Sequence, residues 1–531
     1  MRLVEPQPKI LAAPRKTASR NCLRLVDSTL MEARIIPEWA QPAHLEMAGL
    51  AVRFRTAVCF CTLVRLSEVI ELWYNSPEIP DSTRTQEVVQ GLQIVAYSCH
   101  ETKGPKKMKL SVACNFDEAL LKGLAGYPVY EVYGKLTTDY FGGGRPAFYL
   151  PQVNRSVLER TVKTAHANGI QFNYLLNASA MGNTEFTRVG QRKMDEMLDW
   201  LDGSGIDSIT VANVYFLRLI KKRHPRISVR VSSHRFTDTP RKVRFWVDNG
   251  ADVIVVSEVG VHREFQTLIG MKEAAQGVDL QLIVNNWCRQ DCAIAGNHAV
   301  GLSAASQSKS RGFPLDYCSV LCNHIRLRDP VNYIRANWIR PEDLHYYEKL
   351  GYETFKIVER NTPTQILLER VKAYSERRYD GNLLDLVQNY AYPKEKMGAV
   401  GQDAYSWKRM LKYFIKPRQI NLLRFRKLID FGHAASMLYP REGANPVMID
   451  NRKLDGFMER FTTKNCQSTD CESCRYCHEW AARSVTVDPA WRTKLEPLYD
   501  DLLGDIEGGA FWEPYAKTAA QMVWGFFRTP A

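Results

Sequence analysis

Eight of the thirteen cysteines lie in two short groups, and clustered thiols are the side chains in this sequence best suited to bind a metal. The first group, called here the first quartet, has the spacing C-x3-C-x25-C-x3-C and consists of Cys288, Cys292, Cys318 and Cys322. Four soft thiolates suit an iron–sulfur cluster or a structural zinc ion. Zinc sites favour two residues between paired cysteines. Three intervening residues place the two sulfur atoms farther apart, which matches a cluster of several iron atoms better than a single ion. The spacing therefore predicts an iron–sulfur cluster, with zinc and unliganded cysteines as the alternatives.

The second quartet is more compact and has the spacing C-x4-C-x2-C-x2-C, formed by Cys466, Cys471, Cys474 and Cys477. Four thiolates this close in sequence repel one another unless a metal neutralises them, and the spacing overlaps with ferredoxin-type runs. A second iron–sulfur cluster, a structural zinc ion, and a redox-active or unliganded set are all open interpretations, and His478 could replace one cysteine. Two clusters would allow electrons to pass between them, which suits a redox enzyme better than a hydrolase.

The composition is that of a soluble globular protein, with 45% hydrophobic and 24% charged residues in a chain of 531. No stretch approaches the roughly 18 apolar residues that a membrane helix needs, and the N-terminal residues lack the pattern of a secretory signal. We therefore expect a cytoplasmic protein without a membrane partner, whose thiols stay reduced. The formal charge of +13 is spread over short clusters, which is more typical of a solvated surface than of a nucleic-acid track.

From Met108 onward, short β-branched runs alternate with amphipathic helical stretches. The expected strands are Lys109–Ala113, Val129–Tyr133, Gln171–Leu176, Ser208–Ala212, Ile227–Val231, Asp252–Val256, Gln281–Asn285 and Thr354–Val358. Several helical stretches end at a glycine, as at Gly169, Gly250 and Gly351, because glycine adopts the left-handed conformation that follows a helix. Eight such units predict an α/β protein with a closed (β/α)8, TIM-like barrel. An open doubly wound sheet is the alternative, but no G-x-G-x-x-G follows the first strand, and Gly142–Gly144 is interpreted as a flexible turn.

The chain is predicted to have three regions. Residues 1–107 have weak periodicity and end in a basic linker, so we interpret them as a poorly structured or spurious N-terminal extension, with a small N-terminal domain as the alternative. Residues 108–380 are predicted to form the barrel with the cluster loop. Residues 381–531 are predicted to form a helical, cysteine-rich extension that carries the second quartet.

The reactive groups of such a barrel lie where the C-terminal ends of the strands and their loops converge. Among the polar residues at the expected strand ends, Glu131 and Glu258 are predicted to act as acid or base. Lys356 and Arg360 are predicted to bind an anionic co-substrate, since a guanidinium pairs with a carboxylate in bidentate fashion. All four are assigned from their position in the sequence.

The region from Met108 to about Asp380, half of the chain, resembles the U32 family, whose members have been called U32 peptidases or collagenase-like proteases. The resemblance rests on segments that occur in order and lie near expected strand ends. They are YEVYGKL at Tyr130, GGGRP at Gly142, FNYLLNAS at Phe172, DSITVAN at Asp207, VNNWCRQDC at Val284 and WIRPEDLHYYEKLGYETFKIVER at Trp338.

The resemblance implies a (β/α)8 fold with a 4Fe–4S cluster, and its paired-cysteine pattern assigns the ligands to Cys288, Cys292, Cys318 and Cys322. Better understood relatives hydroxylate without molecular oxygen. One pair acts on a ubiquinone precursor and others act on RNA bases, with prephenate proposed as the oxygen donor.

The sequence departs from the family pattern at two places. Relatives often have proline and arginine directly after the second cysteine, where this chain has Ala293 and Ile294. They often end the eighth strand with Gly-Arg, where this chain has Glu359 and Arg360. These departures leave the cluster credible but put the substrate in doubt.

Three functions fit these patterns. The first is an oxygen-independent, hydroxylase-like redox enzyme that acts on a small-molecule, peptide or RNA substrate, with an anionic co-substrate such as prephenate and an electron-donor protein as partners. The second is a peptidase, although the sequence contains neither H-E-x-x-H nor G-x-S-x-G. The third is an RNA- or peptide-binding maturation factor in which the cluster is structural.

Overall fold

The computed structural model describes residues 108–310, 315–398, 407–437 and 440–526. The interpretation of residues 1–107 as an extension or a small domain lies outside these residues. The chain divides near residue 105 into two units, and all described residues belong to the second unit.

Eight parallel strands close into a barrel in the order of the sequence, which confirms the predicted (β/α)8 fold. The first and last strands pair in parallel, with Leu110 opposite Phe355, so the sheet has no open edge in the barrel. The strands are β1 (Lys109–Ala113), β2 (Val129–Gly134), β3 (Gln171–Leu176), β4 (Ser208–Val211), β5 (Ser228–Val231), β6 (Val253–Val255), β7 (Asp279–Ile283) and β8 (Thr354–Ile357).

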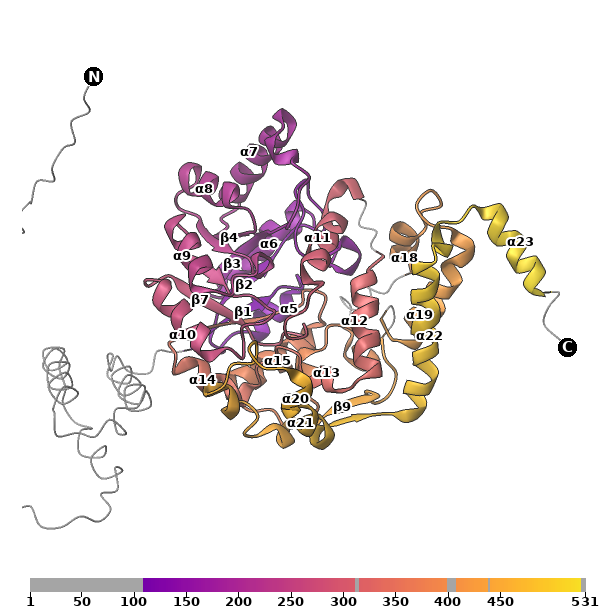
Figure 1. The fold of residues 1–531 in the computed structure, drawn as a ribbon. Coiled ribbons are helices and arrows are strands. Elements are labelled where there is room, and N and C mark those ends of the chain that lie inside the picture. The colour runs from indigo at the N-terminus through magenta and orange to yellow at the C-terminus, as the bar shows by residue number, and fades with distance from the viewer. Residues whose placement is uncertain (1–107, 311–314, 399–406, 438–439, 527–531) are drawn as a thin grey trace, which may run out of the picture. The chain divides into compact units, whose positions relative to one another are not determined.

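Helices follow the strands and cover the outside of the barrel (Figure 1). They are α5 (Glu118–Gly123), α6 (Arg155–Ala167), α7 (Arg188–Gly203), α8 (Val214–Arg223), α9 (Pro240–Asp248), α10 (Phe265–Ala274), α11 (Ala295–Ser306), α12 (Tyr317–Arg328), α13 (Val331–Ile334), α14 (Leu344–Glu348) and α15 (Thr364–Glu376). The Asn154 side chain caps α6 by accepting from the Val157 N–H. Gly169, Gly250 and Gly351 all have positive φ, as expected for residues that end a helix and lead into a strand.

The seventh strand begins and ends two residues earlier than predicted, since β7 spans Asp279–Ile283 rather than Gln281–Asn285. The apolar run does continue, but at Asn285 the side chain replaces the backbone as the hydrogen-bonding partner of the neighbouring strand. The Asn285 side chain donates to the Val358 carbonyl at 3.0 Å and accepts from the Val358 N–H at 2.7 Å. An amide side chain mimics a backbone group here, and propensity alone does not reveal such a substitution.

The connection between β7 and β8 is unusually long and contains α11 to α14 together with all four cysteines of the first quartet. The C-terminal region packs against this connection, because α19 and α22 bury Phe431, Leu495 and Tyr499 in one apolar cluster with Val320 and Leu327 of α12. Figure 1 shows α19 and α22 side by side next to α12. The elements after the barrel are α16 (Leu384–Val387), α18 (Trp407–Phe414), α19 (Phe425–Ala434), β9 (Val447–Ile449), α20 (Cys471–Cys474), α21 (Tyr476–Ser484), β10 (Val485–Val487), α22 (Pro489–Glu507) and α23 (Tyr515–Phe526).

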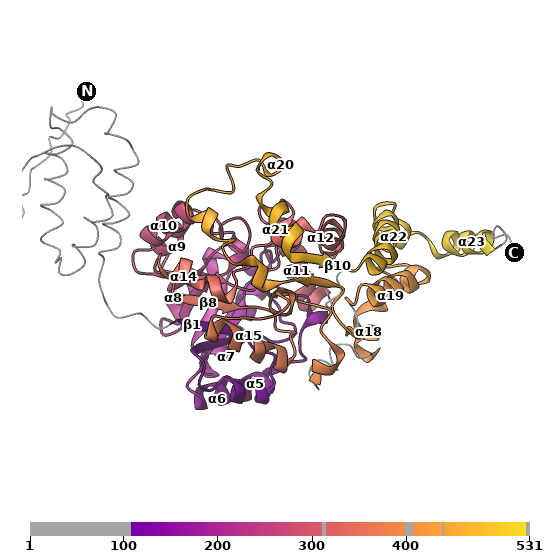
Figure 2. The ribbon, with the colours of Figure 1, turned by 90° about the horizontal axis from the view of Figure 1, so that it is seen from below.

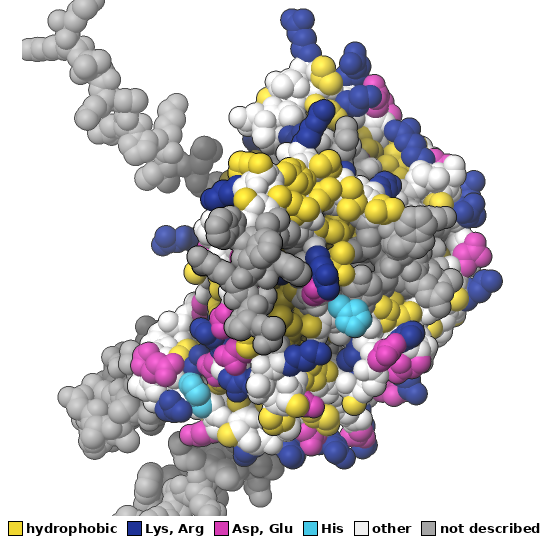
Figure 3. All heavy atoms as spheres, turned by 90° about the vertical axis from the view of Figure 1, so that its right-hand side faces the viewer, with side chains coloured by type: hydrophobic (Ala, Val, Ile, Leu, Met, Phe, Trp, Pro, Cys, Tyr) yellow, Lys and Arg dark blue, Asp and Glu magenta, His cyan; other side chains and the backbone are white. Residues whose placement is uncertain are grey.

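The surface of this C-terminal region carries several exposed apolar side chains, among them Leu411, Trp512 and Tyr515. Figure 3 faces the right-hand side of Figure 1 and shows hydrophobic side chains interspersed with Lys and Arg. Within the described ranges, no helix combines the length and the apolar character needed to cross a membrane.

Candidate functional site

Two adjoining cavities lie at the C-terminal ends of the barrel strands. The inner cavity, of about 60 Å³, is lined in part by Tyr133, Lys356 and Arg360. The second cavity, of about 160 Å³, is lined by all four cysteines of the first quartet, and we call it the cysteine cavity. The residues that line both cavities are Arg145, His234, Glu258, Val358 and Glu359.

Lys356 and Arg360 bring two positive charges into the inner cavity. Their side chains are almost completely buried, and burial lowers the pKa of Lys356 to about 8 and that of Arg360 to about 10. The Lys356 ammonium lies 3.8 Å from the centre of the Tyr133 ring, and among the described residues neither cation forms an ion pair. Because an unpaired buried charge is costly, this cavity is suited to an anionic ligand.

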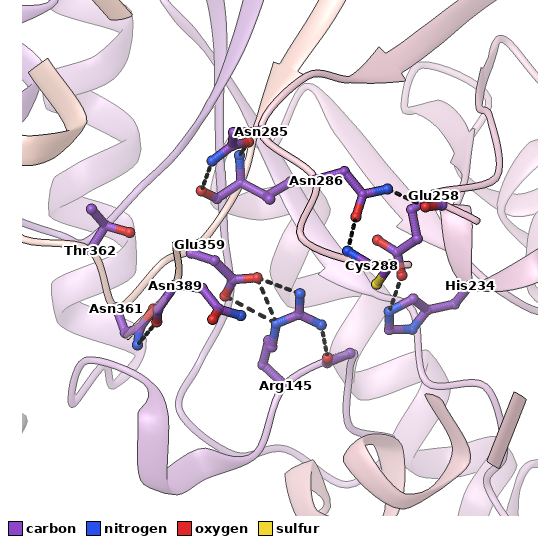
Figure 4. A network of polar contacts seen from close by, with 12 residues as sticks. Arg145, His234, Glu258, Asn285, Asn286, Cys288, Glu359, Asn361, Thr362 and Asn389 are labelled. Carbon is purple, nitrogen blue, oxygen red and sulfur yellow. Dashed lines mark hydrogen bonds and ion pairs between the residues drawn. The ribbon is translucent and has the colours of Figure 1, made fainter. Parts of the chain in front are cut away.

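Arg145 and Glu359 form an ion pair in the shared wall (Figure 4). The Arg145 Nε donates to both carboxylate oxygens of Glu359 at 3.1 Å, and its Nη1 donates to the Gly144 carbonyl at 2.9 Å. Burial alone would raise the pKa of Glu359, but the charge and the hydrogen bonds of Arg145 hold that pKa below its usual value. Glu359 has φ of 93°, in the left-handed region that favours glycine. The position where relatives often have glycine is therefore strained here and carries a carboxylate.

The glycine run before Arg145 is a tightly packed turn, and the prediction of a flexible turn is wrong. The Gly143 N–H donates to the Ser306 hydroxyl at 2.7 Å. A Cβ atom at Gly144 would collide with the His234 ring. The run therefore fixes the backbone next to Arg145, whose role the sequence prediction missed although the GGGRP motif contains it.

The Nε2 atom of His234 lies 3.8 Å from the Oε1 atom of Glu258, and Figure 4 shows the Cys288 sulfur beside them. Burial lowers the pKa of His234 to about 3, so its ring is neutral. Burial raises the pKa of Glu258, which therefore keeps its proton to a higher pH than a solvated glutamate. The pair places a carboxyl of raised pKa beside a neutral imidazole.

The first quartet is assembled from a loop and a helix. Cys318 and Cys322 are separated by one turn of α12 and so share a helix face, while Cys288 and Cys292 lie on the loop that leaves β7. Burial raises the pKa of Cys318, and the nearby Asp316, Cys292 and Cys322 raise it further, which places the thiols of the two pairs near one another. Tertiary folding thus brings both pairs to one cavity.

Several residues that line this cavity carry buried donors without a hydrogen-bond partner. The Arg326 guanidinium stacks over the Trp287 ring and donates to the Cys322 sulfur at 3.1 Å. In the described part of the chain, the Nε atoms of Arg326 and Arg289 and the indole N–H of Trp287 are buried and have no hydrogen-bond partner. Buried donors normally find acceptors, so the wall is complementary to a group that carries acceptor atoms.

Four thiols line the cysteine cavity, a donor set that is chemically suited to an iron–sulfur cluster or a zinc ion. Across the described ranges, no three His, Cys, Asp or Glu side chains converge closely enough to hold one metal ion. A zinc ion requires sulfur atoms at about 2.3 Å, whereas a cluster of several irons accommodates thiolates that are farther apart around a common cavity. The four thiols and the unpaired donors are compatible with an iron–sulfur cluster.

Of the predicted catalytic residues, Glu258, Lys356 and Arg360 line the cavities, whereas Glu131 lines neither. The Glu131 carboxylate is fully buried, with an ion pair to Arg230 at 2.6 Å and a hydrogen bond from Ser111 at 2.6 Å. Its position in the strand suggested the active site, but its partners lie on other strands inside the barrel, Ser111 on β1 and Arg230 on β5. The prediction that Glu131 acts as an acid or base has no geometric support.

The four cysteines of the second quartet line a separate and smaller pocket of about 20 Å³. Its His478 also lies in the pocket wall, where the Nδ1 atom is buried and without a partner among the described residues. The two quartets therefore form two distinct centres.

Comparison with known proteins gives two kinds of similarity. Residues 146–285 match the family model described as Peptidase family U32. The chain is 25% identical to the uncharacterized protease MJ1657 of Methanocaldococcus jannaschii over 360 residues, which is 67% of this chain and 89% of that protein. The solved structure of the U32 peptidase Mk0906 is similar with a TM-score of 0.36 and 18% identity, covering 48% of this chain and 94% of that one.

The family description and the archaeal protein's name both refer to proteolysis, and neither names a cluster or a redox reaction. By name, these similarities favour the peptidase alternative over the predicted redox enzyme.

Proposed function

We propose that the barrel of this chain, whose residues 146–285 match the model of peptidase family U32, is an enzyme whose first quartet holds an iron–sulfur cluster, and that it performs redox chemistry on a carboxylate-bearing substrate or co-substrate. One observation carries the proposal. The cavity lined by Cys288, Cys292, Cys318 and Cys322 shares a wall with a cavity that contains buried cations without ion-pair partners among the described residues.

Four thiolates would hold the cluster, and the Arg326 hydrogen bond to Cys322 would help to stabilise their negative charge. A bound cluster would supply one-electron transfer at this cavity. The unpaired Arg326 and Trp287 donors would gain acceptors when the cluster is in place.

Lys356 and Arg360 would bind the carboxylate of the substrate or co-substrate, and prephenate is the candidate that we propose. Arg145 lies in the shared wall, where it holds Glu359 in place and faces the same space. Glu258, whose raised pKa favours the protonated form, would donate a proton to the bound molecule. The neutral His234 lies beside this carboxyl, with its Nε2 at 3.8 Å from Glu258 Oε1.

Peptide hydrolysis is the second candidate, and the names of the relatives favour it. The geometry gives it little help, because a cysteine nucleophile needs a lowered thiol pKa and burial raises that of Cys288 well above its usual value. Neither nearby histidine activates a thiol: His234 faces Glu258, and the Nε2 of His298 lies 3.1 Å from an Asp316 oxygen. A peptidase would have to use another nucleophile.

The first experiment is anaerobic purification followed by measurement of iron, acid-labile sulfide and visible absorption. We expect a brown protein, and we expect the C288S/C318S double variant to lose the iron of the cysteine cavity. Cys114→Ala is the matched control, because Cys114 is buried at the end of β1 and belongs to neither quartet. Wild-type iron content in the double variant would contradict the proposal.

The second experiment separates the two chemistries. The reduced protein is incubated with prephenate and candidate acceptors, and in parallel with gelatin and unstructured peptides. Oxygen-independent hydroxylation that disappears in C288S/C318S supports the redox enzyme. Peptide cleavage that survives in this variant would support a peptidase, and absence of both reactions in a cluster-loaded protein would favour an RNA- or peptide-binding factor.

A further inference from the structure

The four cysteines of the second quartet, which lie close together in the sequence, line one pocket at the surface of the described region. Cys471 and Cys474 begin and end the short helix α20, and Arg475 then adopts φ of 49° before α21 starts. This left-handed residue turns the chain so that Cys477, near the start of α21, faces the same pocket as Cys474. Cys471 is exposed, and Figure 2 shows the loop that carries α20 at the periphery of the ribbon.

Cationic side chains surround the sulfur atoms of this pocket. The Arg460 Nη2 donates to the Cys474 sulfur at 3.0 Å, and its guanidinium stacks over the Tyr476 ring. Arg335 also lines the pocket, and its buried Nε has no hydrogen-bond partner among the described residues. A pocket with four thiols, two guanidinium groups and an unpaired donor is complementary to a negatively charged group that carries acceptor atoms.

We propose that Cys466, Cys471, Cys474 and Cys477 bind a second iron–sulfur cluster. The alternative is structural zinc, which requires ligands that converge tetrahedrally at about 2.3 Å. No three metal-ligating side chains in the described ranges converge in this way, although all four thiols line one pocket. The compact C-x4-C-x2-C-x2-C spacing is of the ferredoxin type, and hydrogen bonds to sulfur are a recurring feature of cluster sites.

The segment that carries the second quartet is attached to the loop of the first quartet. The Glu264 carboxylate accepts from the backbone N–H groups of Cys466 and Gln467 at 2.8 and 2.9 Å. The Gln467 side chain donates to the Gly260 carbonyl at 2.8 Å and to the Asp291 carboxylate at 3.3 Å. Gly260 has φ of 91°, and a Cβ atom there would lie 2.5 Å from the Asp291 oxygen, so only glycine allows this approach.

The link between the two quartets runs through only two residues and one hydrogen bond. Gln467 follows Cys466 in the chain, Asp291 precedes Cys292, and one hydrogen bond joins the two side chains. If the first quartet holds a cluster, as proposed above, this hydrogen bond joins the residues next to one ligand of each cluster. We expect two reduced clusters linked in this way to interact magnetically.

The first test uses the unmodified protein. Native mass spectrometry of anaerobically prepared full-length chain should show a mass increment for two iron–sulfur clusters and no bound zinc. A single cluster that C471S/C474S retains, with or without bound zinc, would overturn the second cluster site.

The second test uses C471S/C474S and C288S/C318S in parallel, each with circular dichroism to check folding. Each variant should retain about half of the wild-type iron and sulfide. After reduction with dithionite, the electron paramagnetic resonance spectrum of wild type should be broadened by coupling, and each variant should give one uncoupled signal.

The two proposals fail in different ways. Wild-type iron in C471S/C474S overturns the second cluster, while wild-type iron in C288S/C318S overturns the proposed function. A wild-type spectrum equal to the sum of the two variant spectra would contradict the close approach of the centres.

Discussion

Each of the two cysteine quartets has four thiols, but the two are built in opposite ways. The first quartet joins a loop after β7 to helix α12, and its cavity of about 160 Å³ opens toward buried cations. The second quartet lies within twelve consecutive residues, in a pocket of about 20 Å³ with an exposed cysteine. A site that must accept a substrate needs space and charged partners beside its thiols, and only the first quartet has both. The second is better suited to holding a cofactor than to admitting a reactant.

The largest expected effect is a loss of stability when the buried ion pair between Glu131 and Arg230 inside the barrel is broken. Arg230→Met would leave the buried Glu131 carboxylate without its ion-pair partner, and breaking such a pair costs about 3–5 kcal/mol. The free energy of unfolding, measured by urea denaturation, should fall by that amount. Glu264→Ala removes the acceptor that holds the second quartet and should cost less, about 1–3 kcal/mol.

Equal losses in the two variants would contradict the view that the first centre depends on the whole barrel and the second on local contacts. Arg223→Met is a control, because its pair with Asp195 is at the surface, where ion pairs contribute little.

The next effect concerns ligand binding in the first centre. Glu359→Gly removes the carboxylate that occupies Arg145 and relieves the positive φ at this position. Arg145 would then be free to bind a carboxylate ligand, which we expect to tighten binding by about 1.5–3 kcal/mol, on the order of 10- to 100-fold. Isothermal titration calorimetry with prephenate measures the change.

Glu359→Gln is the matched variant, since it removes the charge but keeps the strained backbone. It should tighten binding without the gain in stability that Glu359→Gly obtains from the relaxed backbone. Unchanged affinity in both variants would show that Arg145 does not face the ligand.

A third prediction concerns pH. The pKa of Lys356 is lowered to about 8 by burial, so its positive charge is lost as the pH rises through this value. Carboxylate affinity should therefore fall above pH 8, by at most about tenfold per pH unit, and the fall should disappear in Lys356→Met. The stability contribution has the opposite sign: the unfolded lysine titrates near 10.5, so the Lys356 contribution to the free energy of unfolding should rise between about pH 8 and 10.5. Affinity that stays constant to pH 10 would rule out Lys356 as a binding group.

The smallest effect distinguishes the two centres by their hydrogen bonds to sulfur. Arg326 donates to Cys322 in the first centre, and Arg460 donates to Cys474 in the second. Replacing either arginine by glutamine removes a positive charge that stabilises the reduced cluster, which we expect to lower one reduction potential by about 60 mV, equivalent to about 1.4 kcal/mol. A redox titration followed by electron paramagnetic resonance should show one shifted potential in each variant, and a shift of both by either substitution would mean that the centres are not separate.

The sequence predicted most of the fold and part of the site. The strands followed from β-branched runs and helix-ending glycines, and the barrel followed from eight repeats of that pattern. Glu258, Lys356 and Arg360 line the inner cavity, because Lys356 lies in β8 and the other two lie three residues beyond the ends of β6 and β8. Arg145 was missed because it lies eleven residues beyond β2, where distance along the chain gives no sign of its return to the strand ends.

Some features were decided only by tertiary structure. Glu131 has the same strand-end pattern as a catalytic residue, but the side chains of other strands turn it into the partner of Arg230. Glu359 has a positive φ, which favours glycine over other residue types. Its side chain forms a salt bridge with Arg145 at the C-terminal end of the barrel. Neither outcome is visible locally, because each depends on contacts between residues about a hundred or more positions apart.

Residue type and spacing by themselves determined that eight thiols would form two groups, because the chemistry of a thiol and the reach of a short loop are local properties. Only the folded chain decided that one group would line a cavity of about 160 Å³ beside buried cations, and the other a pocket of about 20 Å³ with an exposed cysteine. The physical reason is that burial and the electric field at a site are sums over the entire surrounding structure, whereas spacing is a property of the chain alone.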